Sequence, residues 1–114
     1  MRVCVPVTRE GSVDPRWGRA DRLALADVEN AEIKSWKEME VGWGEHHEAS
    51  TEARHHALVA RFLNENSVEA VVAGHMGPAM LAMLERMKIR VRLGMTGDAR
   101  EATISLAHFM SEEN

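Results

Sequence analysis

The hydrophobic and polar positions of this chain change their period along its length, and these changes predict the order of strands and helices. Apolar runs rich in Val, Leu and Ala at residues 2–7 and 21–28 predict two strands. Partial alternation at residues 33–41 predicts a third strand, whose charged side chains suit the edge of a sheet. Residues 68–74 are almost purely apolar, as in a strand buried on both faces, and residues 89–95 alternate as a fifth strand.

Apolar residues recur with helical spacing in three other segments. An i, i+3, i+4 stripe predicts a helix over residues 51–66, with Ser50 or Thr51 available as its N-cap. Pro78 stands where the first residue of a second helix belongs, and a broad apolar face follows it. Residues 96–110 predict the last helix, with Thr96 as its cap.

The order of these elements predicts an α/β fold with one five-stranded mixed sheet. Short connections make the first three strands antiparallel neighbours, and helical crossovers make the last two strands parallel to the first. The expected sheet order is 3-2-1-4-5, with the helices packed on the sheet. A chain of 114 residues is long enough for one domain, which we place at residues 1–110, followed by a C-terminal tail at residues 111–114.

The amino-acid composition excludes several kinds of protein. The chain is 45% hydrophobic, but no run approaches the roughly 20 apolar residues that a membrane span needs, and the N-terminus does not resemble a secretion signal. Cys4 is the only cysteine, which excludes an internal disulfide or a zinc site built from cysteines. We therefore expect a soluble, cytoplasmic protein that does not bind membranes. The formal net charge of −4 argues against a general nucleic-acid binder.

The predicted topology brings four loops to one end of the sheet: residues 8–20, 42–50, 74–78 and 94–98. Open α/β sheets bind ligands outside the carboxyl ends of their strands, and this rule selects the same end. The candidate binding residues there are Arg16, Trp17, Gly18, Arg19, Gly74, His75, Gly77 and Pro78.

The chemistry of these loops suits an anionic guest. Free N–H groups at the helix start near Pro78 favour negative charge, and Arg16 and Arg19 add cations. The candidate metal ligands are His46, His47 and His75. Two structural alternatives stay open: the turn before Pro78 can simply connect a strand to a helix, and the paired histidines can simply be solvated.

Several classes of enzyme are disfavoured by the residues that the chain lacks. A two-metal nuclease needs several carboxylates gathered at one site, and the first strand offers none. No Ser-His-Asp or Cys-His arrangement follows from spacing, and no phosphate-binding P-loop is present. We therefore predict that the protein is not an enzyme.

Four segments together resemble the dinitrogenase iron–molybdenum cofactor-binding family, which includes nitrogenase accessory proteins of NifX type. They are "MRVCVPVT" at the start, "RWGRAD" at 16–21, "HH" at 46–47 and "VEAVVAGHMGP" at 68–78. The resemblance spans roughly residues 1–110. It implies a ribonuclease H-like fold and a non-catalytic role: carrying or storing an anionic iron–sulfur or iron–molybdenum cluster during cofactor assembly.

The resemblance also carries over to particular positions. Residues 17–20 match one family box, residues 74–78 match another, and His46 or His47 matches a histidine of the middle loop. Trp17 replaces the usual Phe, and His75 stands where the family commonly has Gly. The implied partners are cluster donor and acceptor proteins, with the chain itself a monomer or a weak homodimer.

Two other functions remain open. The histidines suit a transition-metal or oxyanion binding or sensing protein without a cluster. An acidic stretch at residues 27–52 and an edge strand suit an interaction module, which is compatible with a carrier role.

Overall fold

The computed structural model describes residues 1–112 and confirms the predicted mixed sheet. The strands lie in the order β3-β2-β1-β4-β5. β1 pairs with β2 and β2 with β3 antiparallel, whereas β4 is parallel to both β1 and β5. The strands are β1 Arg2–Pro6, β2 Arg22–Glu29, β3 Glu32–Glu40, β4 Ala70–Val72 and β5 Arg90–Arg92.

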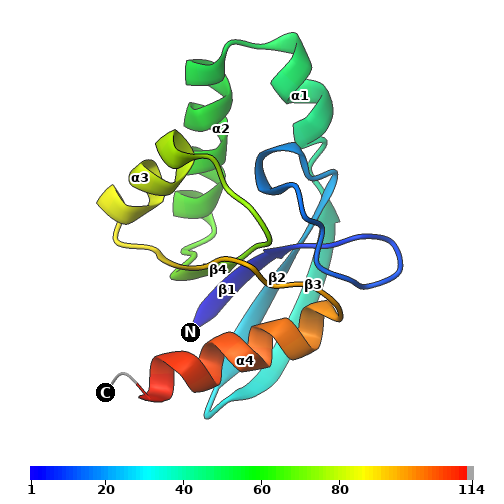
Figure 1. Ribbon diagram of the computed structural model, residues 1–114, viewed down its shortest axis with the longest axis vertical. Helices are drawn as coiled ribbons and strands as arrows, with labels where there is room; N and C mark the ends of the chain where they lie inside the picture. Colours follow the sequence, from blue (N-terminus) through cyan, green and yellow to red (C-terminus); the bar gives the residue numbers. More distant parts are fainter. Residues whose placement is uncertain (113–114) are drawn as a thin grey trace.

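Helices cover both faces of the sheet. Three α-helices, α1 to α3, lie on one side of it and α4 lies on the other (Figure 1). A short 3-10 helix, η1, lies in the loop between β1 and β2. The helices are η1 Trp17–Arg19, α1 Trp43–Ala49, α2 Glu52–Glu65, α3 Pro78–Arg86 and α4 Ala99–Glu112.

The sheet separates two hydrophobic cores because side chains of a strand alternate between its faces. In β1, Cys4 points to the core under α1, α2 and α3, while Val3 and Val5 point to the core under α4. Small residues such as Ala99 and Ala102 let α4 pack closely on its face of the sheet. The almost continuous burial of β1 and β4 follows from this coverage of both faces.

Two predicted helix starts are confirmed and one is wrong. Thr51 caps α2, with its hydroxyl accepting from the Arg54 N–H at 3.2 Å, and Pro78 is the first residue of α3. For α4 the cap is Asp98 and not Thr96, since the Asp98 carboxylate accepts from the Glu101 N–H at 2.9 Å. A carboxylate at this place also favours the positive end of the helix dipole.

Three further differences concern the bounds of helices and strands. The segment predicted as a loop at residues 42–50 contains α1, whose buried Trp43 anchors a short helix that has too few residues for a clear periodic signal. β4 and β5 are each three residues long, which is shorter than the strands predicted at residues 68–74 and 89–95. α4 continues through Glu112, so the predicted tail at 111–114 falls partly in this helix and partly outside the described residues.

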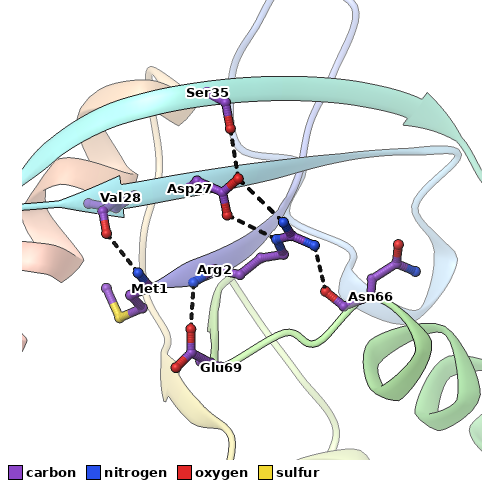
Figure 2. Close-up of polar contacts among 7 residues, drawn as sticks. All are labelled: Met1, Arg2, Asp27, Val28, Ser35, Asn66 and Glu69. Atoms are coloured by element: carbon purple, nitrogen blue, oxygen red, sulfur yellow. Dashed lines mark hydrogen bonds and ion pairs between the residues drawn. The ribbon is translucent and has the colours of Figure 1, made fainter.

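At the end of the sheet opposite the predicted binding loops, Arg2 joins several elements (Figure 2). Its guanidinium donates to both carboxylate oxygens of Asp27 on β2, at 3.0 and 3.3 Å, and to the Asn66 carbonyl after α2. Asp27 also accepts from the Ser35 hydroxyl on β3. The contacts fix the register of β1 against its neighbours.

No helix in the described part of the chain is long and apolar enough to cross a membrane.

Candidate functional site

The loops predicted to share one end of the sheet do meet there. Arg16 forms a parallel β-bridge with His75, which joins the loop after β1 to the turn after β4. The Trp43 N–H donates to the Ala20 carbonyl at 3.1 Å, which ties the start of α1 to the same loop. Positions 19, 47 and 75 therefore lie around one region of the surface.

Gly74 explains how the turn after β4 approaches the first loop so closely. A Cβ atom at this position would lie 3.2 Å from the Pro15 Cα. That distance is shorter than ordinary packing against backbone, so glycine allows this close contact and any side chain here would have to displace Pro15 slightly. Gly77 is different: a Cβ there would meet nothing within 4 Å, and the residue serves as the N-cap of α3.

A cavity of about 450 Å³ opens between these loops and the starts of α2 and α3. It is lined by residues 15–19, residues 75–80, His47, Glu52, His55 and His56. Seven of the eight predicted binding residues line this cavity. The exception is Gly74, which is not among the lining residues. Of the three predicted metal ligands, His47 and His75 line the cavity, and His46 does not.

Groups that favour negative charge surround the cavity. The Arg19 side chain is exposed and forms no ion pair with any described residue, whereas Arg16 pairs with the buried Asp14 at 3.3 Å. The first backbone N–H of α3 to find a partner within the helix is that of Leu81, which donates to the Gly77 carbonyl. The N–H groups of the two preceding residues, Ala79 and Met80, have no acceptor in the helix and lie in the cavity wall.

Trp17 adds a further donor. Its side chain is 1% exposed, and its Nε1 is buried without a hydrogen-bond partner among the described residues. The ring packs edge-on against Trp43 at 5.2 Å between centroids, and Trp43 in turn packs edge-on against Phe62. The aromatic contacts therefore attach the first loop to the body of the protein, and leave one indole N–H unsatisfied beside the cavity.

Three histidines, His46, His47 and His55, contact one another beside the cavity. His55 Nε2 lies 2.6 Å from the Gly18 carbonyl oxygen, and its Nδ1 lies 2.9 Å from Nδ1 of His46. The His47 ring packs edge-on against His55 at 5.1 Å between centroids. Burial lowers the pKa of His55, which favours its neutral form.

The remaining histidines of the cavity are less constrained. His56 Nε2 lies 3.7 Å from the Glu52 carboxylate, and His75 is exposed. Among the side chains that the structure describes, those of residues 1–110, no three His, Cys, Asp or Glu are grouped closely enough to hold a metal ion by themselves. A ligand that spans several of these groups fits the arrangement better than a single ion does.

Seven cavity residues are missing from the predicted site, and four of them carry a nitrogen or sulfur that could contact a ligand: His55, His56, Met76 and Met80. His55 was detectable, because it follows the Thr51 cap by one helical turn and therefore lies at the same end of the sheet. Met76 was detectable too, because it stands beside His75 in the turn and its sulfur is a possible soft ligand for a metal. Met80 carried no such signal, since Met on the apolar face of a helix is ordinarily core.

Comparison with solved structures supports the fold. The crystal structure of PH0822 matches with a TM-score of 0.76 and 17% identity, covering 96% of this chain and 90% of that one. The apo form of the orange protein from Desulfovibrio gigas matches with a TM-score of 0.70 and 20% identity, covering 97% and 88%. The NMR structure of TM1290 from Thermotoga gives 0.68 and 21%, covering 94% and 87%.

Comparison with known sequences gives the family. A search of curated proteins finds no match to the chain. The family model described as "Dinitrogenase iron-molybdenum cofactor" matches residues 1–108, which is almost the whole sequence. The chain therefore belongs to the dinitrogenase iron–molybdenum cofactor family.

Proposed function

We propose that the cavity binds an anionic metal cluster as cargo, of the iron–sulfur or iron–molybdenum type, and that the protein carries or stores this cluster during cofactor assembly. The observation that carries the proposal is the convergence of hydrogen-bond donors and cations on one cavity. The residues that line it include Arg19, the first residues of α3, and Trp17, whose buried indole N–H has no partner among the described residues. The family description names a cofactor and not a reaction, which supports binding over catalysis.

The groups of the cavity divide into two chemical roles. The guanidiniums and N–H groups would hold the sulfide or oxo atoms of the cargo, because donors fixed at a helix start favour negative charge. His47 and His75 would approach its metal atoms, since neutral imidazole is a good ligand for transition metals. Among the lining residues the one carboxylate is that of Glu52, which lies 3.7 Å from His56 Nε2.

Titration under anoxic conditions tests this function. Purified protein is titrated with isolated iron–molybdenum cofactor or with a synthetic iron–sulfur cluster, and binding is followed by visible absorption and by metal content after gel filtration. We expect His75→Ala to weaken binding by at least about tenfold, as loss of a metal-site group ordinarily does. His108→Ala is the matched control, because His108 is also exposed but lies on α4 outside the cavity. Equal binding by both variants would remove His75 from the site.

A second function has specific support in the four imidazoles that line the cavity, those of His47, His55, His56 and His75. They suit a protein that binds a transition-metal ion or an oxyanion without a cluster. Equilibrium dialysis with nickel, zinc, copper and molybdate separates the two functions. Tight binding of a bare ion, together with no retention of either cluster, would favour the second.

A further inference from the structure

A basic surface with exposed apolar side chains lies at the β5 edge of the sheet, away from the cavity described above. We define this β5–α4 surface by Arg86, Lys88, Arg92, Leu93 and Phe109. Residues 86–97 contain four Lys or Arg and no Asp or Glu, although the whole chain has a net charge of −4. The positive charge is therefore local to this edge.

Three cations of the β5–α4 surface lack an acidic partner in the part of the chain that the structure describes. Arg86, Lys88 and Arg92 take part in no ion pair with another described residue. The Arg92 guanidinium lies over the Phe109 ring at 4.2 Å, and its Nε is buried without a hydrogen-bond partner in the described part of the chain. Burying a donor without an acceptor lowers the stability of the protein, and a bound partner that supplies an acceptor would remove this penalty.

Apolar side chains are exposed at the same place. Leu93 is 38% exposed and Phe109 is 41% exposed, and they are the large hydrophobic residues that remain exposed in the described structure. Leu93 directly follows β5, and Phe109 is held beside that strand by its contact with Arg92. Exposed apolar side chains flanked by charges are typical of a protein-binding surface.

The backbone of β5 is also open on one side. β5 pairs with β4 and with no other described strand. The Arg90 N–H donates to Glu69, and the Arg92 carbonyl accepts from Ala73, so both groups point toward β4. The N–H and carbonyl of the intervening Val91 therefore point outward, where another strand can bond to them.

The opposite edge, formed by β3, also has one open side, but its charged side chains are largely paired. On β3, Lys34 pairs with Glu32, and Glu38 and Glu40 both pair with Arg22 of β2. The Trp36 indole donates to Glu38 at 2.9 Å. The paired charges of β3 leave it less positive than the β5 edge, so it attracts an acidic segment less.

We propose that the β5–α4 surface docks an extended acidic segment of a partner protein, which adds to β5 as a further strand. Its carboxylates would pair with Arg86, Lys88 and Arg92, and an aliphatic or aromatic side chain would cover Leu93 and Phe109. Charge complementarity selects this occupant, because the patch is positive while the rest of the molecule repels a nucleic acid or a second acidic copy. The proposal does not depend on what the cavity binds.

The test uses a fluorescent peptide in which Glu alternates with Val around a central Phe, with a peptide that has Lys in place of Glu as its control. Binding is measured by anisotropy at low ionic strength, and the site is mapped by amide shifts in NMR spectra. We expect saturable binding of the acidic peptide alone, with shifts centred on Val91 and Leu93. The double variant Arg86→Glu, Lys88→Glu should weaken binding roughly fivefold or more.

Two further variants separate a specific site from general electrostatics. The double variant Lys34→Glu, Lys37→Glu makes the same change of charge on β3 and should bind the acidic peptide with no more than the small loss expected from net charge. Val91→Pro removes the outward N–H without breaking the ladder to β4, and should abolish strand addition.

Four results would overturn the proposal. They are absence of saturable binding, equal loss of binding in the β3 and β5 charge variants, stronger binding of a single-stranded oligonucleotide than of the peptide, and concentration-dependent self-association that the β5 charge variant abolishes. The last two would assign the surface to nucleic acid and to a second copy of the chain, respectively.

Discussion

The Nδ1 atoms of His46 and His55 lie 2.9 Å apart, so one ring must donate a hydrogen to the other. The Gly18 carbonyl can only accept, so the proton of His55 belongs on Nε2, which faces that carbonyl at 2.6 Å. A neutral His55 then has an unprotonated Nδ1, and His46 must carry its proton on Nδ1. The buried ring thereby determines the tautomer of the more exposed one.

These tautomers can be observed directly. Long-range ¹H–¹⁵N NMR spectra at about pH 8, where imidazoles are neutral, should show His55 protonated on Nε2 and His46 protonated on Nδ1. His55→Phe removes the acceptor, so His46 should then exchange between both tautomers, while His108 should be unchanged. A proton on Nε2 of His46 in the unmodified protein would contradict the hydrogen bond.

The burial of His55 predicts how stability depends on pH. Burial lowers the pKa of His55 in the folded protein below its ordinary value of 6.5, so the unfolded chain binds a proton more readily. Stability is therefore complete above about pH 6.5 and falls as the pH drops below that value. Urea denaturation between about pH 7.5 and 5 should show this loss, and His55→Phe should reduce its slope. An identical slope in the variant would assign the loss to other groups.

The contact of Gly74 with Pro15 predicts a difference between two glycine substitutions. Gly74→Ala places a Cβ 3.2 Å from the Pro15 Cα and should cost about 1–3 kcal/mol of unfolding free energy. Gly77→Ala meets open space and should cost less than about 1 kcal/mol, mainly through a poorer N-cap. Urea denaturation measures both. Equal losses would show that the loop shifts to accept the new methyl group.

The sheet was predictable because its determinants are local. Short connections require antiparallel neighbours, helical crossovers require parallel ones, and both were visible in the pattern of apolar residues. The gathering of positions 16, 19, 47 and 75 at one end then followed from strand direction alone. Such an argument fixes the end of the sheet on which a residue lies, and not the direction of its side chain.

The details of the site depended on packing that no periodicity reveals. α1 is held by the burial of Trp43 against Trp17 and Phe62, which are distant in sequence, so its segment gave no helical signal. The rotation of that short helix places His47 in the cavity wall and turns His46 toward His55. The two adjacent histidines therefore have different environments, although they were equivalent candidates in sequence.

Cys4 should be chemically inert in the folded protein. It is fully buried in the core under α1, α2 and α3, and burial raises the pKa of its thiol far above the ordinary range. The thiolate is the reactive form, so a disulfide reagent should react with Cys4 only when the protein unfolds. The rate of reaction should follow the unfolded fraction as urea is added. Fast reaction in the absence of urea would show that β1 opens locally.

The network around Arg2 should stabilise the fold more than an ordinary surface ion pair does. Arg2 joins Asp27 on β2 to the end of α2, and the hydrogen bonds from Arg2 lower the pKa of Asp27 below its ordinary value of 3.8. Because the folded pKa is lowered, this contribution is present above about pH 4 and disappears as Asp27 is protonated at lower pH.

The matched comparison is with Arg61, which pairs only with Glu65 one turn along α2, at 3.0 Å. Arg2→Met should lower the free energy of unfolding at neutral pH more than Arg61→Met does, because it removes the Arg2 donor of the Asn66 carbonyl and leaves Asp27 with the Ser35 hydroxyl alone. The difference between the Arg2 variant and the unmodified protein should shrink in urea titrations below about pH 4. A difference that stays constant with pH would mean that Arg2 acts through packing of its aliphatic stem and not through the Asp27 carboxylate.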